Sequence, residues 1–264
     1  DPVSKSLLSA ASVVMINKKT VENPLEKTLL FCEDPFQAYN KLVRHFRPFV
    51  SLRQEISETA SIGKNTSIAL GAVVGNHVSI GNNCVIHPNV VIYDHSVIGN
   101  NVIIHANTVI GADAYYYQRR AVGYEKMLSC GRVVIKDNVE IGAACTIDKG
   151  VSGDTIIGKG TKLDNQVHLA HGVVVGENCL MAAQVGVAGK TIIGDNVILW
   201  GQVGVSKSLT IGDNVVVYAQ SGVPKSLEAN KTYFGSPAQE ARQQMKNLAM
   251  INRLDKIWAK TKNI

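Results

Sequence analysis

The chain has 264 residues, of which 45% are hydrophobic and 18% charged, with a formal net charge of +6. This composition excludes a disordered polymer, and no apolar run approaches the roughly 18 residues that a membrane span needs. The positive charge favours an anionic partner such as a phosphate-bearing substrate, an acidic protein or nucleic acid, without choosing among them.

Cysteine usage and the first residues indicate the compartment. Five cysteines form an odd set without CxxC spacing, which argues against a disulfide framework and against a cysteine zinc site. The start, DPVSKSLLSAASVVM, lacks the basic, apolar and cleavage regions of a signal peptide and does not begin with Met. We therefore expect a cytoplasmic protein whose given sequence begins inside a longer gene product.

The first 53 residues differ in pattern from the rest. SVVMIN and LLFCEDPFQAYNKLVRHF predict two strands and a helix, the latter part of a small α/β domain over residues 1–53. We expect the first part of this domain to lie outside the given sequence.

Residues 54–227 follow a six-residue period. Aliphatic residues recur at every sixth position from Ile157 to Val223 without a miss, and the same period runs upstream from Ile62 to Ile110. A period of six is neither that of a helix nor that of a hairpin, but short strands joined by tight corners reproduce it, three to a triangular coil. We predict a mainly β, parallel β-helix whose aliphatic positions point inward.

Further features repeat every 18 residues, one coil. Gly or Asn recurs at one corner, where a left-handed backbone is needed. One glutamine per coil should form a hydrogen-bonded ladder; these are Gln166, Gln184, Gln202 and Gln220. Two histidine pairs are also 18 residues apart, so their rings should stack between neighbouring coils; these are His77 with His95 and His87 with His105.

The period breaks twice, and the breaks predict loops. One is the Tyr-rich and basic segment 112–131, and the other is a slip at 148–154. The long segment is either a lid over a ligand or a solvated excursion, since loops on a rigid scaffold commonly carry function.

A helical extension is predicted over residues 228–264. Ser236, Pro237 and Gln239 form a capping-box pattern that predicts a helix start. An apolar stripe at helical spacing follows, which we expect to pack on the solenoid or on a partner helix; it comprises Met245, Leu248, Ile251, Leu254 and Trp258.

Two histidines in DNQVHLAH raise the question of a site. Because Leu169 points inward, His171 should lie outward at the third corner, with Gly189 one coil further and Lys207 beyond it. A base, an accessible backbone N–H and nearby cations suit a catalytic site. His168 and His171 on a β edge are poor chelators, because their side chains diverge, so we expect no metal site.

Three stretches carry a family resemblance: GADAYYYQRR, GRVVIKDNVEIGAACTIDKGVSGDTIIG and KLDNQVHLAHGVVVGENCLMAAQVGVAG. They resemble signatures of the UDP-3-O-(3-hydroxyacyl)glucosamine N-acyltransferases (LpxD family) of the hexapeptide-repeat acyltransferase superfamily. The resemblance implies a left-handed β-helix, a homotrimer, and transfer of a 3-hydroxyacyl chain from acyl carrier protein to the 2-amine of a UDP-linked glucosamine in lipid A biosynthesis. Acyl carrier protein would be the co-substrate, with no separate cofactor.

Carried over by position, the resemblance implies that His171 is the general base and that the Gly189 N–H is the oxyanion donor. Asp164 matches an acidic residue that orients substrate or contacts pantetheine. The expected substrate-binding set is Asp164, Gln166, His168, Lys190, Lys207, Ser208 and Gly222.

The chain departs from the family in three places. A second site histidine has no equivalent, since the aligned position is near Ser208. Gly222 stands where some members carry methionines near the acyl pocket. Because glycine has no side chain, it would admit a longer acyl chain there. The N-terminal domain is short compared with the uridine-binding domain of the family, so nucleotide affinity would be low if the given sequence were the whole protein.

Two other functions remain open. A nucleotide-sugar N-acetyltransferase using acetyl-CoA would need a short-chain pocket and a CoA site. An inactive solenoid scaffold is favoured by the missing histidine and opposed by the pairing of His171 with Gly189. Nucleic-acid binding is not supported, because the sequence has no basic stripe interleaved with aromatic residues.

Overall fold

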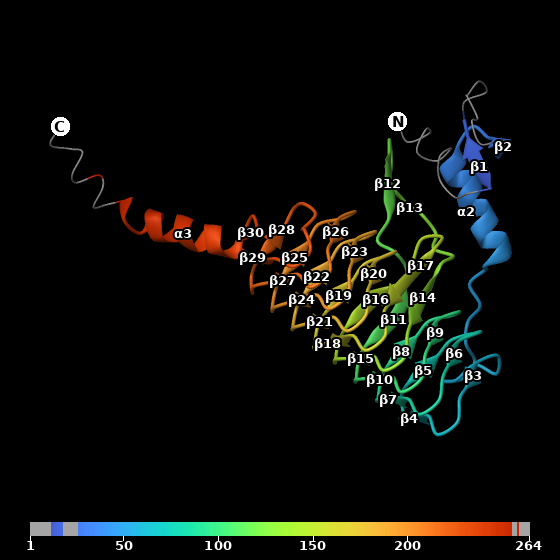
Figure 1. Cartoon of the computed structure of the whole chain (residues 1–264). Coiled ribbons are helices and arrows are strands. Elements are labelled where there is room, and N and C mark those ends of the chain that lie inside the picture. Colours follow the sequence, from blue (N-terminus) through green and yellow to red (C-terminus); the bar gives the residue numbers. More distant parts are fainter. Residues whose placement is uncertain (1–11, 18–25, 255–257, 259–264) are drawn as a thin grey trace. The chain divides into compact units, whose positions relative to one another are not determined.

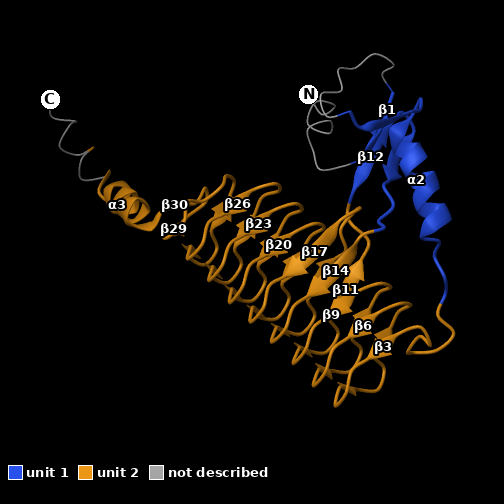
Figure 2. Cartoon of the chain, turned by 45° about the vertical axis from the view of Figure 1, so that its right-hand side comes forward, with its two compact units in different colours: residues 1–51, 116–130 blue, residues 52–115, 131–264 orange. Residues whose placement is uncertain are grey.

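The computed structural model describes residues 12–17, 26–254 and 258 (Figure 1). The described chain divides into two compact units (Figure 2): residues 1–51 with 116–130, and residues 52–115 with 131–264. The ends of the predicted first and third domains, residues 1–11 and those after 258, lie outside the described residues.

The first unit contains the predicted two strands and helix. β1 (Val13–Ile16) and β2 (Thr28–Phe31) pair in parallel, and α2 (Pro35–Phe46) follows. Asp34 caps this helix by accepting from the N–H groups of Phe36 and Gln37 at 3.0 and 3.2 Å. The small α/β segment predicted from the sequence is thus confirmed.

The segment expected as a loop over 112–131 is largely an antiparallel hairpin of the first unit. Its strands are β12 (Tyr117–Arg120) and β13 (Gly123–Lys126). Arg120 bonds both Glu125, at 2.7 Å, and Asp34, at 2.6 Å. The buried side chain of Asn40 on α2 donates to the carbonyl of Lys126 and accepts from the Leu128 N–H. The segment is therefore an ordered hairpin rather than an irregular loop, and Val122 at its tip is fully exposed.

The second unit is a parallel β-solenoid with three sheets, one per face, named here in chain order. The first sheet has eight strands: β3 (Ser61–Ile62), β6 (Ser79–Ile80), β9 (Val97–Ile98), β14 (Arg132–Ile135), β17 (Asp154–Ile157), β20 (Val174–Val175), β23 (Ile192–Ile193) and β26 (Thr210–Ile211). The second has ten: β4 (Ser67–Ile68), β7 (Val85–Ile86), β10 (Ile103–Ile104), β15 (Glu140–Ile141), β18 (Lys162–Leu163), β21 (Leu180–Met181), β24 (Ile198–Leu199), β27 (Val216–Val217), β29 (Thr232–Phe234) and β30 (Gln239–Glu240).

The third sheet carries the candidate site and has eight strands: β5 (Val73–Val74), β8 (Val91–Ile92), β11 (Val109–Ala112), β16 (Thr146–Asp148), β19 (His168–Leu169), β22 (Gly186–Val187), β25 (Gly204–Val205) and β28 (Gly222–Val223). Successive coils pair in parallel at the predicted 18-residue offset, for example Leu169 with Val187. Offsets of 22 and 37 residues occur where the slip and the hairpin are inserted. The predicted mainly β solenoid is confirmed.

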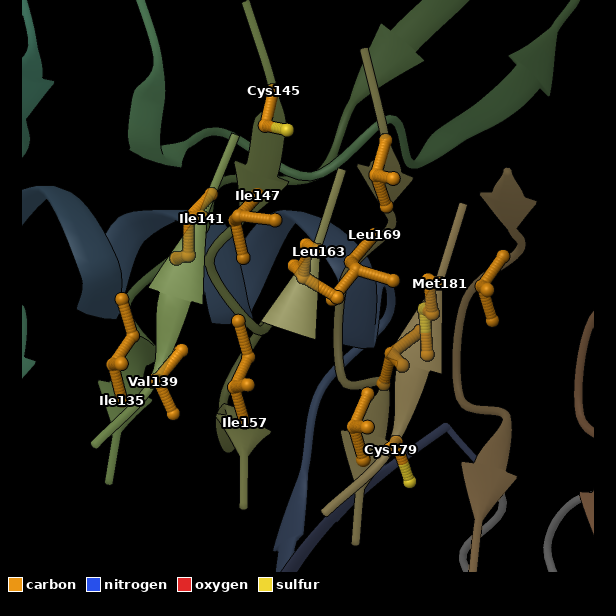
Figure 3. Close-up of a cluster of buried hydrophobic side chains, with 14 of the residues drawn as sticks. Ile135, Val139, Ile141, Cys145, Ile147, Ile157, Leu163, Leu169, Cys179 and Met181 are labelled. Atoms are coloured by element: carbon orange, nitrogen blue, oxygen red, sulfur yellow. The ribbon is translucent and has the colours of Figure 1, made fainter. Parts of the chain in front are cut away.

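The core is a column of the predicted inward residues (Figure 3). All twelve residues of the Ile157 to Val223 series are at most 4% exposed. Ile62 departs from the pattern with 39% exposure, because it lies on the first coil and no coil precedes it. Burial of this column supplies the apolar stabilisation of the solenoid.

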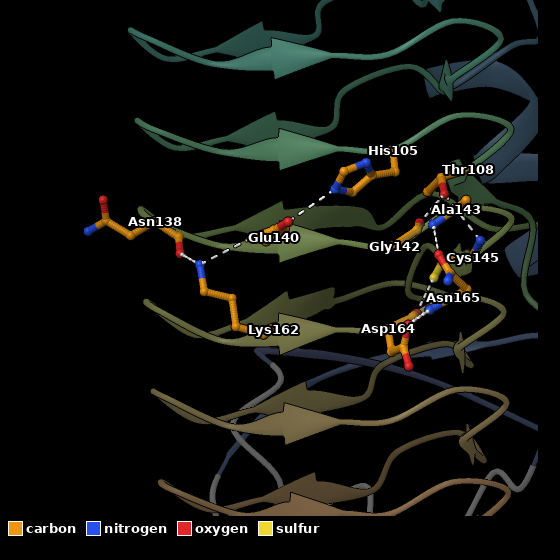
Figure 4. A network of polar contacts seen from close by, with 10 residues as sticks. All are labelled: His105, Thr108, Asn138, Glu140, Gly142, Ala143, Cys145, Lys162, Asp164 and Asn165. Atoms are coloured by element: carbon orange, nitrogen blue, oxygen red, sulfur yellow. Dashed lines mark hydrogen bonds and ion pairs between the residues drawn. The ribbon is translucent and has the colours of Figure 1, made fainter.

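Polar side chains at the corners satisfy the backbone where the strands end. The glutamine ladder is present, with amide bonds of 2.8, 2.8 and 3.1 Å between successive members. Inside the corners, Thr108 donates to the Gly142 carbonyl and accepts from the Cys145 N–H, while the Cys145 thiol donates to the Asp164 carbonyl (Figure 4). The predicted histidine stacks also form, with ring centroids 5.0 and 4.8 Å apart.

The C-terminal helix is confirmed, but its predicted start at Ser236 is wrong. β29 turns back and pairs antiparallel with β30, so Gln239 and Glu240 are strand residues. α3 (Ala241–Ile251) begins after them, and the Glu240 carboxylate caps it by accepting from the N–H groups of Arg242 and Gln243. Strand pairing with Tyr233 and Phe234 overrides the local capping pattern. The apolar stripe is exposed in this single chain, with Met245 at 53% and Ile251 at 57%.

Candidate active site

His171 lies at the third corner, two residues after the buried Leu169 of β19. Its position outside the apolar column agrees with the prediction, yet the residue is only 9% exposed. The reason is its packing on the next coil: a Cβ atom placed on Gly189 would lie 2.6 Å from the Nε2 atom of His171. The imidazole therefore rests on the bare backbone of Gly189, and any larger residue there would displace it.

The surroundings of the His171 imidazole favour its neutral form. Burial lowers the pKa of His171 below its ordinary value, and the nearby Lys190 ammonium lowers it further. Because a neutral imidazole can accept a proton, the ring is prepared for general-base chemistry at neutral pH.

The backbone beside the imidazole offers a hydrogen-bond donor. The N–H groups of Ala188 and Lys190 donate to the carbonyls of Val205 and His171 at 2.9 and 3.0 Å. Within the described part of the chain, the Gly189 N–H between them donates to neither backbone nor side chain. A donor of this kind next to a base is the arrangement that stabilises an oxyanion.

Two lysine side chains lie along the same corner of the solenoid. Lys190 is exposed beside the imidazole, and Lys207 is exposed one coil beyond Gly189. The N–H of Ser208 donates to the Gly189 carbonyl at 3.0 Å, which fixes this coil against the next. The corner therefore combines a base, an N–H donor and positive charge suited to phosphate groups.

His168 is exposed on the outer face of the third sheet, one strand position before Leu169. Its Nδ1 lies 2.8 Å from the hydroxyl of Thr146 on the neighbouring strand. This contact holds the His168 ring against the outer face of the third sheet. The sequence had indicated only that His168 points outward.

Asp164 and Gln166 lie at the second corner, away from His171 within one chain, as predicted. The Asp164 carboxylate accepts from the N–H of Asn165 at 2.7 Å (Figure 4). The side-chain carbonyl oxygen of Gln166 accepts from the amide of Gln184 at 2.8 Å, at the first position of the glutamine ladder. Within one chain these contacts connect neighbouring residues and coils at the second corner.

Gly222 lies further along the third sheet, under the turn before α3. A Cβ atom at position 222 would lie 2.9 Å from the Ser236 hydroxyl, and the Ala238 N–H donates to the Gly222 carbonyl at 2.7 Å. The space above Gly222 is thus bounded by Ser236, a residue that the sequence pattern did not connect with the site.

Sequence reasoning also missed Asp148. This residue ends β16 and is only 7% exposed, and burial raises its pKa to about 6. A carboxyl directly before a break in the six-residue period was the available signal. Among the described residues, no group of three or more His, Cys, Asp or Glu side chains is arranged to hold a metal ion.

The solenoid and its repeats define the class of protein. The chain is a parallel β-solenoid with a six-residue period, and residues 77–112 and 154–189 match the family described as bacterial transferase hexapeptide (six repeats). The second matched segment contains both His171 and Gly189. No helix among the described residues is long and apolar enough to cross a bilayer.

More particular similarity comes from curated relatives. The chain is 54% identical to the UDP-3-O-acylglucosamine N-acyltransferase of Methylobacterium nodulans over 66 residues, which are 25% of this chain and 19% of that protein. The enzyme of the same name from Azorhizobium caulinodans is 52% identical over 66 residues, covering 25% of this chain and 18% of the relative. The matched region thus spans about a fifth of these relatives.

Solved structures share the fold over a larger part of the chain. The UDP-N-acetylglucosamine acyltransferase of Bacteroides fragilis superposes with a TM-score of 0.65 at 28% identity, covering 73% of this chain and 74% of the other. The enzyme of that name from Francisella novicida gives 0.53 at 27% identity, covering 73% and 72%.

Proposed function

We propose that this chain transfers a 3-hydroxyacyl group from acyl carrier protein to the 2-amine of UDP-3-O-(3-hydroxyacyl)glucosamine, a step of lipid A biosynthesis. The observation that carries the proposal is the packing of His171 on Gly189, inside a segment matched by the transferase hexapeptide family. The local similarity to UDP-3-O-acylglucosamine N-acyltransferases supports the acceptor.

In the proposed mechanism, the acceptor amine attacks the thioester carbonyl as His171 takes its proton. The carbonyl oxygen becomes an oxyanion and accepts a hydrogen bond from the Gly189 N–H. When the intermediate collapses, the carbon–sulfur bond breaks, and the imidazolium returns the proton to the departing thiolate. The products are an amide and the free thiol of the carrier protein, so no further cofactor is required.

The remaining residues of the predicted set bind rather than react. Lys190 and Lys207, exposed on the corner, attract the diphosphate of the acceptor and the acidic carrier protein. The proposed co-substrates place the reaction in the cytoplasm. Ser208 holds its coil against Gly189 through its backbone N–H.

A homotrimer belongs to the proposal, and in it Asp164 of one chain would lie beside His171 of a neighbouring chain. Exposed aliphatic residues on the outer faces of the solenoid support it, with Leu180 at 42% and Ile192 at 51% exposure. The apolar stripe of α3 is a further candidate contact between chains.

A second candidate is O-acyl transfer to UDP-N-acetylglucosamine, the acceptor in the names of the two superposed structures. The two reactions differ in the acceptor group, an amine or a hydroxyl, so they are separable by assay.

The test offers both acceptors to the purified protein with a 3-hydroxyacyl carrier-protein thioester, and repeats the assay with acetyl-CoA. Product formed only from the amine acceptor and the carrier thioester supports the proposal. Product from UDP-N-acetylglucosamine would favour the second candidate, and use of acetyl-CoA alone would indicate a sugar acetyltransferase.

A further inference from the structure

Asp148 is a carboxyl on an outer sheet face that is nevertheless buried. Along β16, Ile147 points into the core and is fully buried, so Asp148 alternates to the outer face, as Thr146 does. Thr146 is exposed, whereas Asp148 is 7% exposed. Aspartate is seldom buried to this degree unless it is paired.

Three titratable groups lie around Asp148, and among the described residues none of them bonds its carboxyl. They are His168 on β19, Asp113 just after β11, and Lys149, the next residue along the chain. Lys149 bonds Asp113 at 2.9 Å. Among the described residues no hydrogen bond or ion pair reaches the Asp148 carboxyl, and its electrostatic neighbours are His168, which favours its ionised form, and Asp113, which opposes it.

The position of Asp148 relates it to the candidate base. Ile147 on β16 pairs with Leu169 on β19. Asp148 is the residue after Ile147, and His171 is the second residue after Leu169. With strands about 4.8 Å apart and about 3.3 Å per residue, the two Cα atoms are separated by on the order of 6 Å. Both residues therefore border one end of the third sheet.

The adjoining surface has room for a ligand. On the next strand, Gly186 pairs with His168, and a Cβ atom built there would meet no atom within 4 Å. The outer face of the third sheet next to His168 is therefore free of side chains above Gly186. The Asp148 carboxylate lies on one side of this space, and the His171 imidazole lies at the adjoining corner.

We propose that Asp148 is a specificity-determining residue of the acceptor site, whose carboxylate accepts a hydrogen bond from the ammonium or a hydroxyl of an amino sugar on this face. The inference rests on the proposed function and adds the residue that selects a donor-rich acceptor. A buried carboxylate with no counterion is unfavourable in the free protein, and a bound donor group satisfies it.

The test is isothermal titration of UDP-3-O-(3-hydroxyacyl)glucosamine into the wild type, Asp148→Asn and Asp213→Asn, at pH 7.5 and 5.5. Asp213, exposed at a different corner, controls for loss of one carboxylate. We expect Asp148→Asn to bind about tenfold more weakly at pH 7.5. The difference from wild type should shrink at pH 5.5, because a larger fraction of the Asp148 carboxyl is protonated there than at pH 7.5, and Asp213→Asn should bind as the wild type does.

Thermal unfolding separates a binding role from a structural one. Removal of a buried charge without a counterion should leave the Tm of Asp148→Asn unchanged or higher, although affinity falls. Wild-type affinity in Asp148→Asn, or a Tm lowered by several degrees, would overturn the inference. If the variant binds normally while the wild type transfers acyl groups, only the inference fails; if the wild type neither binds nor acylates this acceptor, the proposed function fails with it.

Discussion

At the level of single residues, the contact between His171 and Gly189 gives the most directly testable predictions. The imidazole occupies the space that a side chain at position 189 would need. Its orientation therefore depends on one missing methyl group, and catalysis is sensitive to displacements of about 1 Å.

Gly189→Ala should reduce kcat/KM about a hundredfold or more while the solenoid stays folded, because the new Cβ pushes the imidazole away. Acyl-transfer kinetics measure the loss. The matched control is Gly153→Ala, whose Cβ would meet nothing within 4 Å. Equal activity of the two variants would show that the imidazole position is unimportant.

The pH profile should report the lowered pKa of His171. A base must be neutral, so kcat/KM should rise with pH through a midpoint below the ordinary histidine value of about 6.5. Lys190→Gln removes a neighbouring positive charge, and the midpoint should move upward. An unchanged midpoint in Lys190→Gln would contradict the electrostatic account.

The same pKa shift predicts a dependence of stability on pH. Because folding lowers the pKa of His171, the unfolded chain binds the proton more readily, so stability is lost as pH falls below about 6.5. His171→Gln should flatten this part of the curve in thermal unfolding at pH 5 to 8. A curve identical to that of the wild type would contradict the assignment.

At the scale of elements, small polar residues inside the corners connect successive coils. Thr161 is fully buried; its hydroxyl donates to the Gly176 carbonyl at 3.0 Å and accepts from the Cys179 N–H at 3.0 Å. Thr161→Val keeps the volume but leaves both groups unsatisfied, which should destabilise the solenoid by about 1–3 kcal/mol. Denaturant midpoints measure this, and Thr161→Ser, which retains the hydroxyl, should lose clearly less stability than Thr161→Val.

The first unit depends on Asn40 in a comparable way. Its side chain bonds the backbone at Lys126 and Leu128, so Asn40→Ala should loosen the hairpin from α2. Limited trypsin digestion should then cleave at Arg119 about tenfold faster, since proteolysis reports the population of opened states. Lys41→Ala, an exposed change on the same helix, serves as the control and should be cleaved at the wild-type rate.

These elements also show what local sequence can predict. The six-residue period fixes which side chains point inward, because each coil repeats the same geometry, and it places Gly189 beside His171. The start of α3 could not be predicted, because Tyr233 pairs with Glu240 through a turn that no short pattern encodes. The burial of Asp148 was equally hidden, since it arises beside a break in the period.

At the level of the whole molecule, the proposed role of Asp164 beside His171 requires more than one chain, because the two residues lie at different corners of the solenoid. Sedimentation equilibrium should give three times the chain mass of 28.4 kDa. A monomer under assay conditions would remove the interfacial role of Asp164.

The most direct test of the central claim is acyl transfer from a 3-hydroxyacyl carrier-protein thioester to UDP-3-O-(3-hydroxyacyl)glucosamine by the wild type and His171→Ala. We expect amide product with the wild type and a rate at least about a hundredfold lower with the variant. Equal rates would contradict His171 as the base, and no transfer by a folded wild-type protein would contradict the proposed reaction.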